Sequence, residues 1–402
     1  MKIRQFRVFY CGMINTVALE KQVGAHLHIG AAANKMISVV RAIRDMGERA
    51  YLVSLPFLGQ KCTKSLTKTM VLHEKGCPQI FLSTPSNKYA RKFYSFISFA
   101  WFCFHEIDRN DKIIIYNHAI EYLLGVVILR LKRARIFMDI EDGPRSDELG
   151  FKAFLHNGLF FIFRTITSSK ALVVSSALAK KLEIREYCVV HGAIARSRIQ
   201  ESKIKSSYEI NYPKDAIDIH YGGSLSVETG IELFCEAVDI LLLLQDQFLR
   251  KIRFVITGFG SGQMIKDLES RTLGSMVEIS YSSDCTYAQY LELFSSCQIG
   301  LCLKLPESEV GMTTFPSKVV EITSAGLLLI STRVSDVPYL FNENTAVLLS
   351  RAAPQELAET ILSLVNDPEK IELLARCGQR SALEMFESKK VGERIVNFIC
   401  ND

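Results

Sequence analysis

The chain has 402 residues, 48% of them hydrophobic, and a formal net charge of +5. This length exceeds what one hydrophobic core normally supports, so two domains are expected. The charge is unevenly spread, because residues 1–200 hold 30 Lys and Arg against 15 Asp and Glu, whereas residues 201–402 hold 18 against 28. No uninterrupted apolar run approaches the roughly 20 residues of a membrane-spanning helix, which predicts a soluble or peripheral protein.

The cysteines and the N-terminus indicate a cytosolic protein. Eleven Cys are scattered from Cys11 to Cys400 without a Cys-x-x-Cys pair, and Cys297 and Cys302 lack His partners at zinc spacing. Reduced thiols fit this pattern. The apolar run Val8–Ile14 is short and followed by polar residues, so it predicts a first strand rather than a signal peptide.

Strand and helix signals alternate through the first half. The expected elements, in chain order, are strand Phe6–Tyr10, helix Ala31–Met46, strand Ala50–Ser54, strand Lys112–Tyr116, helix Ile120–Leu131, strand Ile136–Ile140 and a closing segment Val189–Gly192. This alternation predicts parallel sheets covered by helices on both faces. The charged, Ser-containing stretch Arg196–Asp215 is typical of a linker.

The second half repeats the alternation. Its expected elements are strand His220–Gly223, helix Ile231–Leu244, strand Arg253–Gly258, strand Val277–Tyr281, helix Tyr287–Ser295, strand Ile299–Lys304, a helix ended by Gly326, strand Leu327–Ile330, and amphipathic helices within Gln355–Val365, Pro368–Phe386 and Lys389–Ile399. We therefore expect an α/β fold of two doubly wound, Rossmann-like domains facing a central cleft. The predicted boundaries are 1–200 for the first domain, 201–217 for the linker, 218–375 for the second domain and 376–402 for C-terminal helices that return toward the first.

Residues 311–332 carry the most informative motif. Pro316 suits a first helical position, and the free N–H groups around Thr314 and Ser317 would then carry the positive end of the helix dipole. A diphosphate or a sugar hydroxyl fits such a position. Glu321 follows Ser317 by one helical turn, so both side chains could reach a ligand there. The pattern indicates a nucleotide-sugar site, although an ordinary turn and helix with a solvated Glu would look the same.

At this point the second half resembles the nucleotide-sugar-binding domain of GT-B glycosyltransferases, most closely the retaining glycosyltransferase family 4. The motifs that carry the resemblance over residues 218–350 are Tyr221–Leu225 with Thr229–Ile231, Phe254–Gly262, Phe315–Lys318 with Glu321, Gly326 and Thr332, and Ser335–Pro338. The first half matches more loosely, through Gly30, His118, Val173–Ser176 and Val189–Gly192. The resemblance implies a second domain that binds the donor and a basic first domain that binds the acceptor.

The resemblance also implies roles for single residues. Glu321 would hold the ribose hydroxyls and the backbone of Thr314–Ser317 the transferred sugar. The expected donor-binding residues are Gly222, Gly223, Ser224, Gly258, Gly260, Lys304, Thr313, Thr314, Phe315, Pro316, Ser317 and Glu321, and the expected catalytic residues are His118, Lys318 and Glu321.

Three positions depart from the family pattern. Thr313 stands where the family has its first Glu, and Ser224 and Thr229 stand where it has an Arg and a Lys that neutralise the leaving diphosphate. Losing a fixed cation normally costs several kcal/mol of transition-state stabilisation. Lys318 and Lys304 are the available replacements.

The first domain offers further candidates at strand ends. His118 would contact the sugar or its acceptor, or be a structural histidine. Asp139, Glu141 and Asp142 could bind Mg²⁺ or an acceptor hydroxyl, but the GT-B scheme needs no metal, so a polar turn at the edge of the cleft is favoured. Gly30 begins a helix of small residues, which would permit close approach of a ligand or simply helix packing.

Two aromatic segments raise the question of a membrane. Residues 88–104 are basic at one end, aromatic along most of their length and contain the chain's one Trp, and residues 151–163 raise the same question more weakly. Insertion in the plane of a membrane fits these segments. A buried helix fits the first slightly better, because its apolar residues lie nearly all round.

These patterns predict a hexosyltransferase-type enzyme that moves a sugar from a nucleotide diphosphate sugar onto a glycan or lipid-linked acceptor. Retention and a role in bacterial surface polysaccharide synthesis follow from the resemblance. We expect no cofactor, no nucleic-acid partner, and a cytoplasmic location at the inner face of the plasma membrane. A nucleotide-sugar epimerase and a non-catalytic GT-B partner subunit are the alternatives, and the sequence leaves donor, acceptor, linkage and oligomeric state open.

Overall fold

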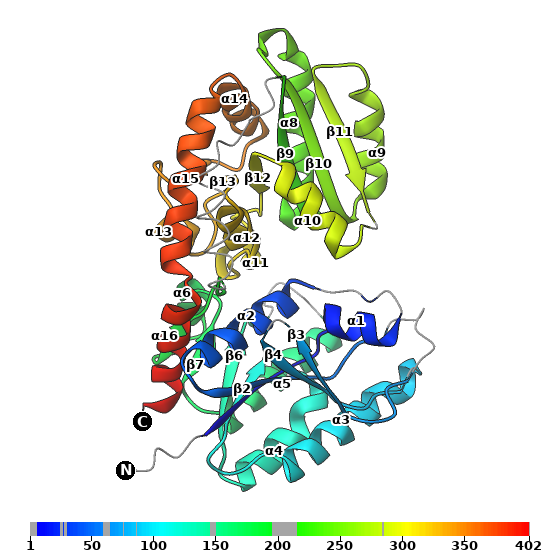
Figure 1. The fold of residues 1–402 in the computed structure, drawn as a ribbon, viewed down its shortest axis with the longest axis vertical. Coiled ribbons are helices and arrows are strands. Elements are labelled where there is room, and N and C mark those ends of the chain that lie inside the picture. Colours follow the sequence, from blue (N-terminus) through cyan, green and yellow to red (C-terminus); the bar gives the residue numbers. More distant parts are fainter. Residues whose placement is uncertain are drawn as a thin grey trace. The chain divides into compact units, whose positions relative to one another are not determined.

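A computed structural model describes residues 6–24, 27, 30–58, 65–74, 76–85, 87–144, 150–194, 215–283 and 285–401. The chain divides into two compact units, one of Met1–Ala195 with Phe386–Asp402 and the other of Arg196–Met385. Each unit is an α/β layer structure built on a largely parallel sheet (Figure 1). The expected linker lies outside the described residues except for its last three positions.

The first unit contains an eight-stranded sheet in the order β3-β4-β2-β1-β5-β6-β7-β8. Its strands are β1 (Arg7–Gly12), β2 (Arg49–Ser54), β3 (Met70–Glu74), β4 (Cys77–Phe81), β5 (Lys112–Tyr116), β6 (Arg135–Ile140), β7 (Ala171–Val173) and β8 (Tyr187–Val189). All neighbours are parallel except β3 and β4. The expectation of purely parallel sheets is wrong at this edge, where Gly76, with φ of +80°, permits a tight hairpin turn.

Seven α-helices accompany this sheet in the described part of the unit. They are α1 (Val17–Val23), α2 (Ala31–Asp45), α3 (Lys88–His105), α4 (Leu123–Leu131), α5 (Phe151–Ile166), α6 (Ser176–Lys181) and α16 (Ser388–Cys400). Helix α16, drawn in red in Figure 1, packs along α2, so the end of the chain completes the first unit. Val391, Ile395 and Ile399 share one buried cluster with α2 and β1.

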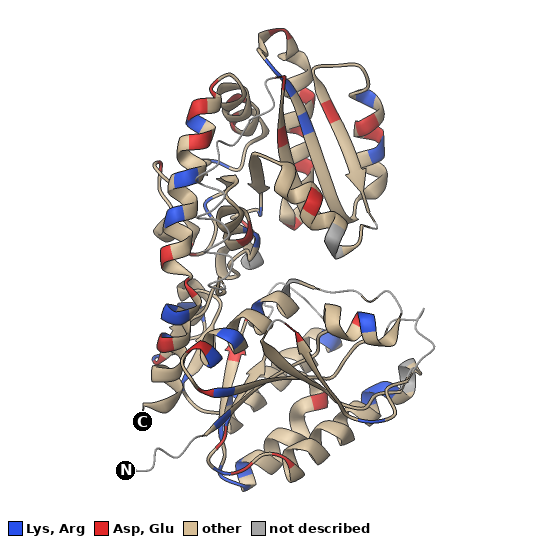
Figure 2. Cartoon of the chain, in the orientation of Figure 1, with Lys and Arg blue, Asp and Glu red and all other residues tan. Residues whose placement is uncertain are grey.

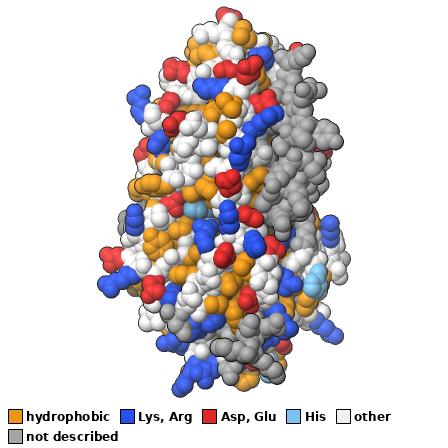
Figure 3. All heavy atoms as spheres, turned by 60° about the vertical axis from the view of Figure 1, so that its left-hand side comes forward, with side chains coloured by type: hydrophobic (Ala, Val, Ile, Leu, Met, Phe, Trp, Pro, Cys, Tyr) orange, Lys and Arg blue, Asp and Glu red, His pale blue; other side chains and the backbone are white. Residues whose placement is uncertain are grey.

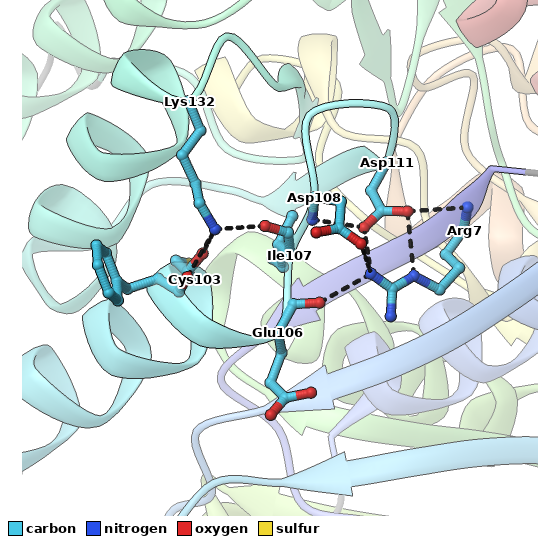
Figure 4. A network of polar contacts seen from close by, with 8 residues as sticks. Arg7, Cys103, Glu106, Ile107, Asp108, Asp111 and Lys132 are labelled. Carbon is cyan, nitrogen blue, oxygen red and sulfur yellow. Dashed lines mark hydrogen bonds and ion pairs between the residues drawn. The ribbon is translucent and has the colours of Figure 1, made fainter.

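A network of polar contacts ties the start of β1 to the segment between α3 and β5 (Figure 4). The Arg7 guanidinium donates to the carboxylates of Asp108 at 2.9 Å and Asp111 at 2.7 Å and to the Glu106 carbonyl at 2.9 Å. Lys132 Nζ, just after α4, donates to the carbonyls of Cys103, Phe104 and Ile107 at the end of α3. The C-terminal end of α3 is therefore fixed to β1 on one side and to α4 on the other.

The second unit contains a six-stranded parallel sheet in the order β11-β10-β9-β12-β13-β14. Its strands are β9 (Ala216–Leu225), β10 (Lys251–Gly260), β11 (Val277–Ser282), β12 (Ile299–Cys302), β13 (Leu328–Ser331) and β14 (Val347–Leu348). Its helices are α8 (Ile231–Leu243), α9 (Gly262–Arg271), α10 (Tyr287–Ser296), α11 (Glu309–Thr313), α12 (Lys318–Ala325), α13 (Val337–Leu340), α14 (Pro354–Val365) and α15 (Pro368–Met385). Helix α9 was not expected from the sequence.

Strands β9 and β10 are each ten residues long, longer than expected. They pair through their glycine-containing ends, with Gly223 opposite Gly258 and Leu225 opposite Gly260. Gly258 has φ of +131°, and a Cβ there would lie 1.9 Å from the Gly223 carbonyl oxygen. These glycines thus permit close pairing at the C-terminal end of the sheet, which is the end where ligands bind in this class of fold.

None of the helices in the described part of the chain combines the length and the apolar character needed to cross a bilayer.

Candidate functional site

Lys318 lies against the glycine end of β9 in the second unit. A side chain at Gly223 would come within 2.6 Å of Lys318 Cε and 3.4 Å of its Nζ, so the lysine stem covers the Gly223 backbone. Its ammonium lies 5.9 Å from the centroid of the Tyr290 ring. No described carboxylate forms an ion pair with it. A half-buried cation with no counter-ion in the described part of the chain is therefore held at the end of β9, where an anion would complement it.

Glu321 stands one turn further along α12 and is half-buried. Its carboxylate has no hydrogen-bond partner among the described side chains and backbone groups, while its N–H donates to the Ser317 carbonyl at 3.3 Å. Helix α12 begins at Lys318, with Ser317 as its N-cap and Gly326, at φ of +84°, as its C-cap. The expected end at Gly326 is confirmed.

The expectation that Pro316 is the first helical residue is wrong. Pro316 precedes the N-cap, and its carbonyl accepts a hydrogen bond from the Val319 N–H at 3.0 Å, three residues on. The tight first turn uses this i→i+3 bond, so the helix starts later than the proline preference suggests. The Ser317 side chain makes no capping bond and stays exposed.

The loop before α12 and the end of β12 meet through Lys304. Its Nζ donates to the Thr314 carbonyl at 3.3 Å. Thr313, the last residue of α11, and Phe315 are both buried. Lys304 therefore holds the loop just before α12 at Thr314, whereas the side chains of Thr313 and Phe315 are buried in the protein interior.

Ser224 and Thr229, where the related family carries cations, form a local turn. The Thr229 hydroxyl donates to the Ser224 carbonyl at 2.6 Å and accepts from the Ser226 N–H at 3.0 Å. The Tyr221 hydroxyl donates to the Thr229 carbonyl at 2.9 Å. The Thr229 hydroxyl is therefore engaged by backbone groups of its own turn. The positive charge near Gly222 and Gly223 comes from Lys318.

His220 on β9 was missed as a site residue. Its Nε2 lies 2.9 Å from the Thr257 hydroxyl, and its ring packs edge-on against Phe294 at 4.9 Å and Tyr290 at 5.8 Å. Burial, helped by the charge of Lys318, lowers the His220 pKa to about 3. The ring is neutral at pH 7, and it positions Thr257 beneath Gly222. The signal available in the sequence was a histidine two residues before a glycine pair at a strand end.

In the first unit, Lys35 of α2 connects the carboxylates at the end of β6. Its Nζ lies 3.2 Å from Asp139 and forms an ion pair with Glu141, and the Tyr10 hydroxyl donates to Asp139. The Lys35 and Asp139 side chains are 6% and 0% exposed. Burial, with Asp139 adding to it and Lys35 opposing it, raises the Glu141 pKa to about 7. Two of the three expected carboxylates are thus held by an internal cation, which the sequence did not reveal.

The third carboxylate, Asp142, belongs to a separate turn. Asn117, with φ of +54°, accepts from the N–H groups of Glu141 at 2.8 Å and Asp142 at 3.1 Å, and it donates to the Asp142 carboxylate at 3.0 Å. This left-handed asparagine joins the ends of β5 and β6. In the described part of the chain, no group of three or more His, Cys, Asp and Glu side chains is arranged to hold a metal ion.

His118 follows Asn117 and is buried against α5. Its Nε2 lies 3.2 Å from the His156 carbonyl oxygen, and its ring packs 4.3 Å from the His156 ring and 5.3 Å from Phe160. Its Nδ1 is buried without a partner among the described residues. Burial lowers the His118 pKa to about 4, so the ring is neutral at pH 7. Gly30, the N-cap of α2, has φ of −80°, which any residue can adopt.

Comparisons with known proteins agree with this architecture. Residues 241–397 match the family model described as glycosyl transferase-like. None of the curated proteins compared with the sequence matches it.

Three solved structures illustrate the likeness of fold. Sucrose-phosphate synthase from Thermosynechococcus elongatus matches at 12% identity and a TM-score of 0.67, covering 98% of each chain. HepE from Anabaena, solved in complex with UDP and glucose, matches at 13% identity and a TM-score of 0.62, also covering 98% of each chain. TarM matches at 10% identity and a TM-score of 0.67, covering 99% of each chain.

The two Rossmann-like units, the match of residues 241–397 and these likenesses over nearly the whole length lead to one conclusion: the chain has the GT-B fold of glycosyltransferases.

Proposed function

We propose that this protein is a retaining glycosyltransferase that moves a sugar from a nucleotide diphosphate sugar onto a glycan or lipid-linked acceptor. The observation that carries the proposal is the Lys318 ammonium, which lies beside Gly223 without a described carboxylate partner and one turn before Glu321. A fixed cation at the end of the central strand suits a leaving diphosphate, whose negative charge grows as the sugar departs.

The donor would lie along the C-terminal ends of β9, β10 and β12. In this proposal Glu321 binds the ribose hydroxyls and Lys318 the diphosphate. The backbone at Gly222–Ser224 and Thr314–Ser317 supplies N–H groups, Lys304 holds the Thr314 loop, and Gly258 and Gly260 allow close approach of the strands. HepE was solved with UDP-glucose, which makes a UDP-sugar the first donor to test.

The acceptor would be bound by the first unit, with Gly30, His118 and Asp142 at strand and helix ends. The Nδ1 of neutral His118, buried without a partner among the described residues, could accept a hydrogen bond from a hydroxyl. The Lys35 network keeps Asp139 and Glu141 fixed beside this region. We propose a bacterial surface glycan as the product and a cytoplasmic site of action at the membrane.

Glu321→Ala tests the central assignment. We expect donor affinity to fall at least about tenfold, because a hydrogen bond to a charged group is worth roughly 1.5–3 kcal/mol. Glu292→Ala, which removes an exposed carboxylate from α10 of the same unit, is the matched control and should change nothing. Binding is measured by calorimetry with a series of nucleotide diphosphates, and transfer by release of the nucleotide.

Lys318→Met separates catalysis from binding. Transfer should slow by about a hundredfold while the fold is kept, as happens when one preorganised donor is removed from a developing anion. Wild-type donor affinity and turnover in both Glu321→Ala and Lys318→Met would rule out this site.

A non-catalytic GT-B partner subunit is the second candidate. It is favoured by the uncharged Ser224 and by Thr229, whose hydroxyl is engaged in its own turn. Such a subunit would bind no nucleotide, or bind it without turnover, over a full panel of donors and acceptors. Consumption of donor without acceptor would instead indicate an epimerase.

A further inference from the structure

Three helices of the first unit expose large apolar side chains to solvent. On α3, α4 and α5 the most exposed are Phe93 (70%), Trp101 (67%), Phe104 (59%), Leu131 (79%), Phe151 (76%), Phe154 (72%) and Phe161 (60%). We call the solvent side of α3–α5 the three-helix face. Contiguous apolar patches of this kind are rare on soluble monomers and mark interaction surfaces.

The exposed residues form stripes at helical spacing. On α3, Phe93, Ile97, Trp101 and Phe104 recur every three or four residues, while Phe99 on the other side is buried. The expectation that this helix is buried all round is therefore wrong. One side of α3 packs in the core and the opposite side, equally apolar, faces solvent, which the helix periodicity alone does not distinguish.

The stripes belong to one surface because α4 contacts both α3 and α5. The end of α4 is also tied to the end of α3, since Lys132 donates to three carbonyls there (Figure 4). On α4, Leu124, Val127 and Leu131 continue the apolar surface.

The charged residues of α3, α4 and α5 are all positive. Their sequences contain no Asp or Glu, and their cations lie toward the ends, at Lys88, Arg91, Lys92, Arg130, Lys152 and Arg164. Glu121, just before α4, is buried. Figure 2 draws α3 and α4 mostly in tan between their ends. By contrast, the face drawn in Figure 3 mixes blue and red side chains, with orange ones scattered between them.

A basic pocket lies where α4 and α5 end. Its volume is about 620 Å³, and its lining includes Arg130, Arg133, Arg135 and Lys170 but no Asp or Glu. Lys170 also pairs with exposed Glu186 at 3.1 Å. Four cations around one opening suit a phosphate group, and two of the apolar helices, α4 and α5, end directly beside it.

We propose that the three-helix face docks on a bilayer that contains anionic phospholipids, with its aromatic side chains among the headgroups and a lipid phosphate at the basic pocket. Apolar stripes on helices whose own charged residues are all cations match a membrane interface, where an apolar interior lies beneath negatively charged headgroups. The inference extends the proposed function, because a lipid-linked acceptor lies in such a surface. Membrane docking is tested without donor or acceptor. The docking proposal and the proposed glycosyltransferase function can therefore fail independently of each other.

The single Trp of the chain reports docking directly. With vesicles of phosphatidylcholine and phosphatidylglycerol, Trp101 emission should shift to the blue and be quenched by brominated lipid chains. Pure phosphatidylcholine vesicles should bind much more weakly, and added salt should weaken binding to the anionic vesicles, because exposed charges are screened.

Matched variants separate the two contributions. Phe93→Ser with Phe104→Ser should weaken vesicle binding at least about tenfold, since each removes an inserted aromatic side chain. Arg130→Gln with Arg133→Gln should weaken binding to anionic vesicles by about fivefold per cation. Tyr339→Ser, at an 82% exposed aromatic of the second unit, is the control and should bind as the wild type does.

The absence of a blue shift, or equal binding to neutral and anionic vesicles, would overturn the proposal. A second result would also overturn it: the wild-type protein does not bind vesicles but self-associates with rising concentration in the ultracentrifuge, and Phe93→Ser with Phe104→Ser abolishes the self-association. A second copy of the chain would then cover the three-helix face. Circular dichroism confirms that each variant is folded.

Discussion

At the scale of single residues, the buried charges of the first unit decide its behaviour with pH. Lys35 faces two carboxylates, so one negative charge in the interior is not neutralised. Burial, together with this excess of negative charge, raises the Glu141 pKa to about 7. The Lys35 pKa is also raised, by Asp139 and Glu141 against the opposing effect of burial, so its own contribution is lost only in the alkaline range. Between mildly acidic and neutral pH, Glu141 is therefore the group that titrates.

Glu141→Gln tests this effect. The folded chain keeps a proton on Glu141 that the unfolded chain releases, so wild-type stability should fall as the pH rises from about 4.5 to about 7. The side chain that the Glu141→Gln variant carries at this position cannot ionise. The free energy of unfolding of the variant minus that of the wild type should therefore rise by roughly 1–3 kcal/mol between pH 5 and pH 8. Urea unfolding at several pH values measures this.

Glu186→Gln is the control for that experiment, because Glu186 is an exposed carboxylate that also pairs with a lysine. It should keep the wild-type pH dependence. If the free energies of unfolding of Glu141→Gln and wild type differ by a constant amount over the same pH range, Glu141 does not hold a proton in the folded chain.

At the scale of elements, the glycines of β9 and β10 determine how closely the strands approach beneath the proposed donor site. Gly222 lies next to His220 and Thr257, and Gly223 next to Lys318. Gly258 combines a positive φ with direct contact to the Gly223 carbonyl. A side chain at Gly258 would therefore meet rigid backbone and not a movable side chain.

Gly258→Ala should destabilise the second unit by more than about 3 kcal/mol, since strain from the positive φ adds to a backbone clash. Gly274→Ala is the matched control, because Gly274 has φ of +77° but nothing within 4 Å of an added Cβ. That substitution should cost only about 1–2 kcal/mol. Thermal unfolding compares the two, and equal losses would mean that the clash is relieved by a shift of β9.

At the scale of the whole molecule, the C-terminal helix belongs to the first unit although most of the chain before it belongs to the second. Helix α16 approaches α2 so closely that a Cβ at Gly392 would lie 2.0 Å from the Ala42 carbonyl oxygen. Two units with separate cores need not unfold together.

Gly392→Ala should therefore lower the melting temperature of the first unit, by several degrees, and leave that of the second unchanged. Gly158→Ala, at a helical glycine of the first unit with open space around it, should instead stabilise that unit by up to about 1 kcal/mol. Calorimetry with limited proteolysis assigns each transition to its unit. Equal shifts of both transitions by Gly392→Ala would show that the units unfold as one.

Much of the fold was predictable because its signals are local. The apolar runs of β5 and β6 and the glycine that ends α12 fall where the sequence places them. The β3–β4 hairpin and α9 were missed, since their patterns are weak. In the candidate site, Lys304 and Thr314, both named from the sequence as donor-binding residues, lie in contact, whereas Lys35, Asn117 and His220 were not anticipated.

The sequence alone determined the alternation of strands and helices, the glycine ends of the strands and the Lys318–Glu321 motif, because each depends on residues close together in the chain. Only the tertiary structure decided which side of α3 is exposed, that Lys35 lies between Asp139 and Glu141, and that Gly392 packs against Ala42 of α2. Those features depend on contacts between residues far apart in the chain, and hydrophobic periodicity carries no information about which distant partner covers a given face.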